Sequence, residues 1–195
     1  MGVKEDYENR VRASFTYIKA TQSQNISVFS ASPVRIREQK EFQYYEVGAS
    51  NITDSGAIIV NRSDKLKKSA NETSFNRQYL RLGDVVVPFR ATPQFGVIVE
   101  TPEVELVPNT SMIVIRTNSA IHGANLCAFF NQDFVCEYLE YLISEHDKNI
   151  LSVDMLEMLL IPSLQYCNSE ESFVRMQKIT QHYKEIKVLS QLLID

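Results

Sequence analysis

The chain has 195 residues, of which 44% are hydrophobic and 23% are charged, so it is long enough for one domain with a substantial core. This composition excludes a chain that is disordered throughout, and no apolar run approaches the roughly 18 residues that span a bilayer, so we expect a cytoplasmic protein. The three cysteines, Cys127, Cys136 and Cys167, form no C-x-x-C pair, which favours reduced core residues over a metal or redox site.

The net charge of −4 conceals an uneven distribution along the chain. Residues 1–100 contain 14 Lys and Arg against 11 Asp and Glu, whereas residues 101–195 contain 6 against 13. Attraction between opposite charges predicts that a polyanion would bind the N-terminal half. An imbalance of this size also arises by chance, so the charge distribution is one argument among several.

Most of residues 12–120 have the pattern of short strands. These runs are rich in Val, Ile, Phe and Tyr and end at Asn, Asp, Pro or Gly, which favours a curved, mixed sheet or barrel over alternating strand–helix units. The predicted strands are 14–19, 26–29, 44–48, 57–60, 84–89, 96–100 and 111–116. We therefore expect an α+β fold in which helices pack on this sheet.

The longest polar stretch, residues 61–76, interrupts these strands. It contains Arg62, Lys65, Lys67 and Lys68 and few apolar residues, which predicts an exposed loop. A basic loop of this kind suits phosphate binding, although a basic loop taken alone is more often an ordinary solvated surface.

Beyond residue 124 the apolar spacing changes to three or four residues. Phe130, Phe134 and Tyr138 follow this spacing, which predicts a helix packed on the sheet, with Asn131 or Asp133 as its N-cap. Aromatic residues at helical spacing are far more often core residues than a base-stacking surface.

The globular body is predicted to close near residue 164. Ser152 is suited to cap a short helix over residues 153–157, and the apolar strand 158–161 that follows is expected to end at Pro162. We therefore divide the chain into a globular body, residues 1–164, and a C-terminal helix within residues 165–195.

The C-terminal helix is predicted over residues 169–195, because Glu170 and Glu171 complement the dipole of its first turn. Its apolar residues have the spacing of a heptad seam. The seam residues are Met176, Ile179, Tyr183, Ile186 and Leu193. Two interpretations remain open: the helix pairs with a partner helix, for dimerisation or subunit docking, or it folds against its own domain.

The usual signatures of catalysis are missing from the sequence. We find no Gly-rich phosphate loop, no H-E-x-x-H and no Asn-Pro-Pro-aromatic segment, and the three histidines are too dispersed to predict a metal site. Glu100, Glu103 and Glu105 would suit a metal-dependent nuclease, but no lysine lies between Lys68 and Lys148. We therefore expect no catalytic residues, no metal and no cofactor.

Four segments, in this order, resemble the target-recognition domain of type I restriction specificity subunits. Residues 44–58 are similar to the family's early strand, polar turn and Gly-containing return, and residues 79–87 (YLRLGDVVV) to its Gly-Asp element before an apolar run. Residues 125–142 are similar to its helical stretch, and residues 150–164 to its closing segment that ends in Ile-Pro. The chain resembles one half of such a subunit, with a single recognition domain.

The resemblance implies a non-catalytic protein that selects a double-stranded DNA sequence, while separate subunits methylate or cut the DNA in restriction and phage defence. Its implied partners are DNA, a DNA methyltransferase, restriction subunits and a second copy of the chain bound through the C-terminal helix. For phosphate contact we single out Arg62, Lys65, Lys67, Lys68 and Arg77. For reading base edges we single out Asn76, Arg90 and Gln94, because Arg suits guanine and Asn or Gln suits adenine in the major groove.

Two other functions compete with this one. A diverged recognition domain without DNA binding would act as a protein-interaction or regulatory subunit, which agrees with the acidic total charge. An independent nuclease or methyltransferase is the third hypothesis, and the missing motifs count against it.

Overall fold

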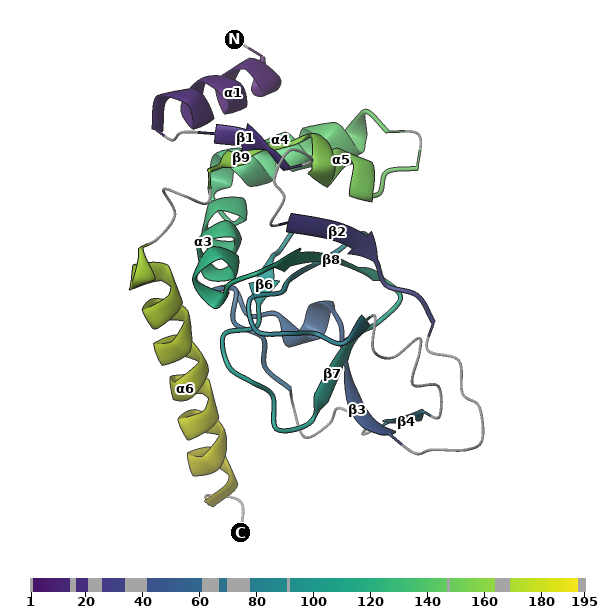
Figure 1. Ribbon diagram of the computed structural model, residues 1–195, viewed down its shortest axis with the longest axis vertical. Helices are drawn as coiled ribbons and strands as arrows, with labels where there is room; N and C mark the ends of the chain where they lie inside the picture. Colours follow the sequence, from purple (N-terminus) through teal and green to yellow (C-terminus); the bar gives the residue numbers. More distant parts are fainter. Residues whose placement is uncertain are drawn as a thin grey trace.

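The computed structural model describes residues 2–14, 17–20, 26–33, 42–60, 67–69, 78–90, 92–146, 148–163 and 169–192 (Figure 1). Its helices are α1 (Val3–Ser14), α3 (Ala120–Phe130), α4 (Asp133–Ser144), α5 (Val153–Met158) and α6 (Glu170–Leu192), with a short 3-10 turn at Ala49–Asn51. Its strands are β1 (Tyr17–Lys19), β2 (Ile26–Ser30), β3 (Phe42–Val47), β4 (Lys67–Ser69), β5 (Val85–Pro88), β6 (Gly96–Val97), β7 (Glu105–Pro108), β8 (Met112–Thr117) and β9 (Leu160–Pro162).

The strands form three separate sheets. An antiparallel sheet has the order β2-β8-β5-β6, and a mixed sheet has the order β4-β3-β7, in which β3 runs parallel to β7. The third is the pair β1-β9. The expected α+β fold with mixed strands and packed helices is confirmed, although the described strands form no closed barrel.

The strand β5 separates two apolar cores, which explains its continuous run of valines. Val85 and Val87 belong to the larger core, together with Phe129 and Phe130 of α3, whereas Val86 faces a smaller core formed with the β3–β7 side of the molecule. Both faces of β5 are buried. The β2-β8-β5-β6 sheet is therefore the middle layer, between the helices and the β4-β3-β7 sheet.

The first and last parts of the body are held together at one end of the molecule. Tyr17–Lys19 of β1 pairs with β9, and the Tyr7 ring of α1 stacks on Tyr138 of α4 at 4.2 Å between centroids, while its hydroxyl donates to the Leu160 carbonyl. The prediction of a strand from residue 14 was wrong at its start, because Ser14 ends α1, a helix that the strand pattern did not reveal.

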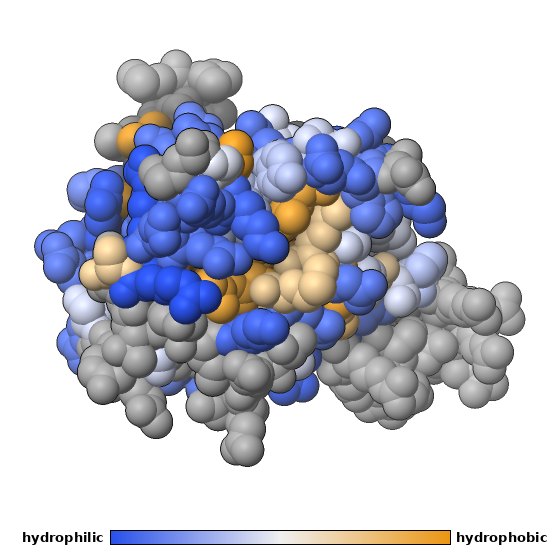
Figure 2. Space-filling model, turned by 90° about the horizontal axis from the view of Figure 1, so that it is seen from above, coloured by the Kyte–Doolittle hydropathy of each residue, from blue (hydrophilic) through white to orange (hydrophobic). Residues whose placement is uncertain are grey.

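This end of the molecule also carries exposed apolar surface. Seen from above, apolar side chains interrupt an otherwise hydrophilic face (Figure 2). Met158, at the end of α5, is 67% exposed. The end that joins β1 to β9 is therefore not uniformly polar.

Two helices, α3 and α4, occupy the region in which the change of spacing predicted helix. The predicted N-cap was wrong: Gln132 occupies the N-cap position of α4, without a side-chain capping hydrogen bond, and Asn131 ends α3. The Asn131 amide is used elsewhere, since its Oδ1 accepts from the Phe95 backbone N–H at 2.9 Å and its Nδ2 donates to the Phe95 carbonyl at 2.8 Å. Asn131 thus ties the end of α3 to the segment before β6.

The closing segment follows the prediction closely. The Ser152 hydroxyl accepts from the Met155 backbone N–H at 3.2 Å and caps α5. The following strand begins later than predicted and includes Pro162, which pairs with Tyr17 of β1.

The other predicted strands fare differently. Those at 26–29, 44–48, 84–89, 96–100 and 111–116 correspond to β2, β3, β5, β6 and β8. The predicted strand 57–60 is wrong, because only single bridges form there, from Ile58 to Ile52 and from Ala57 to Val97. Strands β4 and β7 were not predicted.

Candidate nucleic-acid interface

The Gly-Asp turn before β5 is built around a close approach of two backbones. Gly83 has a φ of +88°, which favours glycine, and a Cβ atom there would lie 2.6 Å from the Ser119 carbonyl oxygen. A Cβ atom on Gly123 of α3 would lie 2.1 Å from the Gly83 carbonyl oxygen. The turn and the first turn of α3 therefore fit together only with glycine at both positions.

Asp84 of the same turn forms a buried ion pair. Its side chain is fully buried, and its Oδ2 lies 2.8 Å from a terminal guanidinium nitrogen of Arg116 on β8. The Arg81 backbone N–H donates to Oδ2 at 2.9 Å, and Arg116 also donates to the Tyr79 carbonyl at 2.6 Å. A charge-assisted network of this kind fixes the backbone of the turn, so the Gly-Asp element is a structural feature rather than a ligand-binding one.

The residues just before this turn are anchored as well. Gln78 is buried, and its Oε1 accepts from the Ser32 backbone N–H at 2.6 Å. Partial burial, followed by a hydrogen bond with Glu105, raises the pKa of Tyr79 to about 12. Gln78 and Tyr79, which closely follow the basic segment in the sequence, are therefore held in fixed positions.

The residues predicted to contact phosphates are only partly within the described structure. Arg62, Lys65, Asn76 and Arg77 lie outside the described residues. Lys67 and Lys68 lie in β4, which pairs with residues 42–44 at the start of β3 and occupies the edge of its sheet. Lysine is typical of such edge strands, where it discourages pairing with other strands.

Arg90 and Gln94 lie in a different place, in the turn between β5 and β6 of the other sheet. Arg90 is exposed, and its guanidinium carbon lies 5.3 Å from the centroid of the Phe89 ring. The Gln94 Nε2 lies 3.5 Å from an Asp54 carboxylate oxygen. The described members of the two predicted sets therefore lie in different places, Lys67 and Lys68 in β4 and Arg90 and Gln94 in the turn between β5 and β6.

The predicted seam of α6 is divided between two environments. Met176 is buried in the larger core and Ile179 packs partly against it, whereas Tyr183 is 43% and Ile186 is 62% exposed. Leu193 lies outside the described residues. The interpretation that the helix folds on its own domain is correct for the first half of the seam, and the exposed half remains available to a partner.

Polar contacts also hold α6 on the body. The Asn125 Nδ2 of α3 donates to the Ser169 carbonyl at 3.0 Å, and Gln177 Nε2 lies 3.5 Å from the Val99 carbonyl oxygen. Lys184 forms an ion pair with Glu100. A lysine does therefore lie beside one member of the acidic cluster, although from a distant part of the chain.

Chemical groups suited to metal or thiol chemistry are sparse in the described part of the chain. No group of three His, Cys, Asp or Glu side chains is placed to hold a metal ion there. Burial raises the pKa of the Cys127 thiol to about 12, so it is a core residue, as predicted; Cys136 is partly buried, and Cys167 lies outside the described residues. None of the described helices has the length and apolarity needed to cross a membrane.

Similarity to known proteins is found in the structure of this chain and not in its sequence. No protein-family model matches the sequence, and no curated protein matches it. Among solved structures, the S subunit of a type I restriction-modification system from M. genitalium matches with a TM-score of 0.52 and 14% identity over 96% of this chain and 46% of that one. A structure described as the basis of complex assembly and conformational transition of the type I R-M system matches with a TM-score of 0.50 and 14% identity over 98% of this chain and 47% of that one.

The chain has the target-recognition fold of these S subunits. The resemblance inferred from the four sequence segments is thereby confirmed at the level of the fold. The chain spans about half of the length of the solved structures that it matches.

Proposed function

We propose that this chain is a non-catalytic module that selects a double-stranded DNA sequence for a type I restriction-modification system. The observation that carries this proposal is the likeness of nearly the whole chain to about half of an S subunit. In such a division of labour, this chain chooses the DNA site, and separate methyltransferase and restriction subunits modify or cut it.

The distribution of charge supports a DNA surface around the basic segment. The segment ends at the anchored Gln78, and its described part, β4, lies at a sheet edge. We assign phosphate contacts to Arg62, Lys65, Lys67, Lys68 and Arg77. Lysine and arginine there would neutralise phosphates and set the position of the protein on the duplex without reading sequence.

Base reading is assigned to Asn76, Arg90 and Gln94. Arg90 is exposed, and its stacking on Phe89 leaves the guanidinium donors available for the two acceptors of a guanine edge. Gln94 would exchange its long contact with Asp54 for an adenine edge. These contacts would give the sequence preference that the phosphate contacts lack.

Binding to duplex DNA across a salt series tests the proposal. Replacing Lys65, Lys67 and Lys68 with glutamate should weaken binding, measured by fluorescence anisotropy, and reduce the log–log salt slope by roughly 2.7, at about 0.9 per lost contact. The matched control replaces Lys4, Lys19 and Lys148 with glutamate, which changes the net charge equally. Equal losses in both variants, or no binding by the folded parent at low salt, would favour the protein-interaction alternative.

Assembly through α6 is a further part of the proposal. Tyr183 and Ile186 are exposed apolar residues on a helix whose other face is already buried, so we assign them to contact with a second copy of the chain. Replacing both with aspartate should convert a dimer to a monomer in light scattering. These two positions suit the test because Ile179, also in the seam, packs against the chain's own core.

A further inference from the structure

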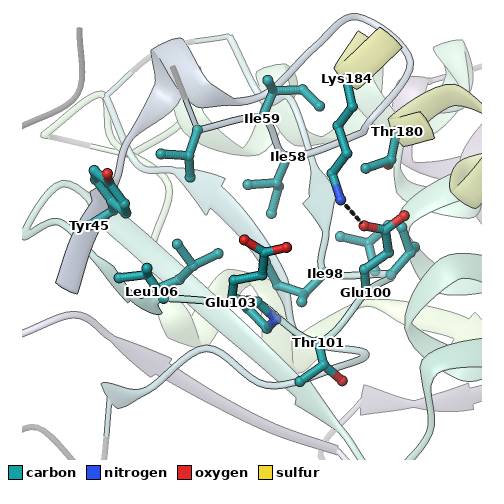
Figure 3. Close-up of a pocket in the computed structure, with 15 residues that line it drawn as sticks. Tyr45, Ile58, Ile59, Ile98, Glu100, Thr101, Glu103, Leu106, Thr180 and Lys184 are labelled. Atoms are coloured by element: carbon teal, nitrogen blue, oxygen red, sulfur yellow. Dashed lines mark hydrogen bonds and ion pairs between the residues drawn. The ribbon is translucent and has the colours of Figure 1, made fainter. Parts of the chain in front are cut away.

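A groove of about 600 Å³ lies between α6 and the chain that joins β6 to β7 (Figure 3). Its floor is aliphatic and includes Ile58, Ile98 and Leu106. Thr180 and Lys184 of α6 line it on one side. The groove therefore combines apolar surface of the body with one flank of the C-terminal helix.

The two glutamates of this groove differ in their partners. Glu100 is paired with Lys184. Glu103 is exposed and its carboxylate is directed into the groove (Figure 3), and it has no hydrogen bond or ion pair with any residue that the structure describes. An exposed carboxylate at the edge of an apolar groove can attract and pair with a cationic side chain of a docking partner.

The outer face of α6 has the complementary pattern. Tyr183 and Ile186 are exposed. Arg175, Lys178 and His182 are separated from one another by three and four residues, so they share one strip of the helix. This strip adjoins the one that carries Tyr183 and Ile186. These three side chains are also exposed, and none has an ion pair within the described ranges. The helix thus presents an apolar strip with a basic edge.

We propose that the groove receives the α6 helix of a second copy of this chain. Tyr183 and Ile186 of one copy would contact the aliphatic floor of the other, and the basic edge would face Glu103. A two-fold arrangement lets each copy provide one helix and one groove. This inference rests on the proposed dimer and deepens it, since pairing of α6 with α6 alone would leave Glu103 without a role.

The charge of the groove argues against DNA as its occupant. Glu100 and Glu103 would repel phosphates, whereas the basic edge of α6 is attracted to the same surface. The duplex and the second copy would therefore use different faces of the molecule.

A charge-swap experiment on the full chain tests the groove. Glu103→Lys should weaken the dimer, measured by sedimentation equilibrium at moderate salt, by at least about tenfold, because it opposes like charges at a contact that excludes water. Arg175→Glu with Lys178→Glu should weaken it similarly. Combining all three changes should restore the parental dissociation constant to within about threefold, because the charges are then complementary again.

The control for these variants is Glu145→Lys, the same charge change at an exposed position at the end of α4. It should leave the dissociation constant within about twofold, as expected for a charge far from the contact. The circular dichroism spectrum of Glu103→Lys should match that of the parent, because an exposed residue is not needed for the fold of each copy.

Three results would overturn the groove proposal: a parent that is monomeric, a Glu103→Lys dimer as tight as the parent, or a failed rescue. If the aspartate variant at Tyr183 and Ile186 dissociates while Glu103→Lys does not, α6 pairs with α6 instead. DNA binding is scored separately, so a successful charge swap in a protein that binds no duplex would refute the proposed DNA recognition and leave the groove proposal intact.

Discussion

Two ion pairs join distant parts of the described structure, and they differ in their surroundings. The Asp84 carboxylate is fully buried and the Arg116 side chain is 18% exposed, whereas Lys184 and Glu100 are 56% and 31% exposed. The first pair joins β8 to the turn before β5, its neighbour in the same sheet, and the second lies at the contact between the body and α6. Breaking the buried pair is therefore expected to cost much more stability than breaking the exposed pair.

The largest effect is expected at the buried pair. Asp84→Ala leaves the guanidinium of Arg116 without its carboxylate and removes the acceptor of the Arg81 backbone N–H, so we expect a loss of about 3–5 kcal/mol in the free energy of unfolding. Chemical denaturation of the purified protein measures it.

A double replacement sharpens this prediction. Asp84→Leu together with Arg116→Met removes both charges and leaves no unpaired ion. We expect this variant to lose less stability than Asp84→Ala. If it loses more, the pair contributes to stability beyond the cost of stranding one charge.

An intermediate effect is expected where apolar packing attaches α6. Met176→Ala removes a side chain that is 6% exposed, and we expect a loss of about 2 kcal/mol in the free energy of unfolding, because a cavity replaces buried methylenes. Val174→Ala, at a position that is 39% exposed on the same helix, is the control. Equal losses in both variants would show that α6 is not anchored through Met176.

The smallest effect is expected at the exposed pair. Lys184→Ala should lower the free energy of unfolding by less than about 1 kcal/mol, because solvent screens the pair and its side chains lose freedom when they form it. Urea unfolding at low and high salt measures this contribution. A loss as large as that of Met176→Ala would mean that the two ion pairs are energetically alike after all.

The sequence predicted those elements that depend on a pattern of neighbouring residues, such as an apolar run or a capping residue. Residues 84–89 contain the run that became β5, and Ser152 predicted the cap of α5 because a cap acts within three residues. The helix α1 was not predicted, because Tyr7 and Val11 are its only buried apolar residues and two residues do not define a helical period. The strand β7 was missed because Glu105 and Pro108 interrupt its apolar pattern.

The contacts of the candidate site could not be predicted from local sequence patterns either. The Gly-Asp element was visible in the sequence, but the partner of Asp84 lies on β8, 32 positions away, and nothing in the local pattern marks Arg116 as that partner. The groove at Glu103 was equally hidden, since Ile58, Leu106 and Lys184 meet there from separate parts of the chain.

The sequence by itself determined the α+β class, the order of the main strands and the presence of a C-terminal helix with an apolar seam, because these depend on periodicity and on contacts within a few residues. Only the tertiary structure decided how that seam is used. Met176 and Tyr183, seven residues apart, have equivalent places in the same repeat, yet one is buried and the other is 43% exposed. Periodicity fixes which side chains share a face of a helix, but only the packing of α6 on the body decides which part of that face is covered.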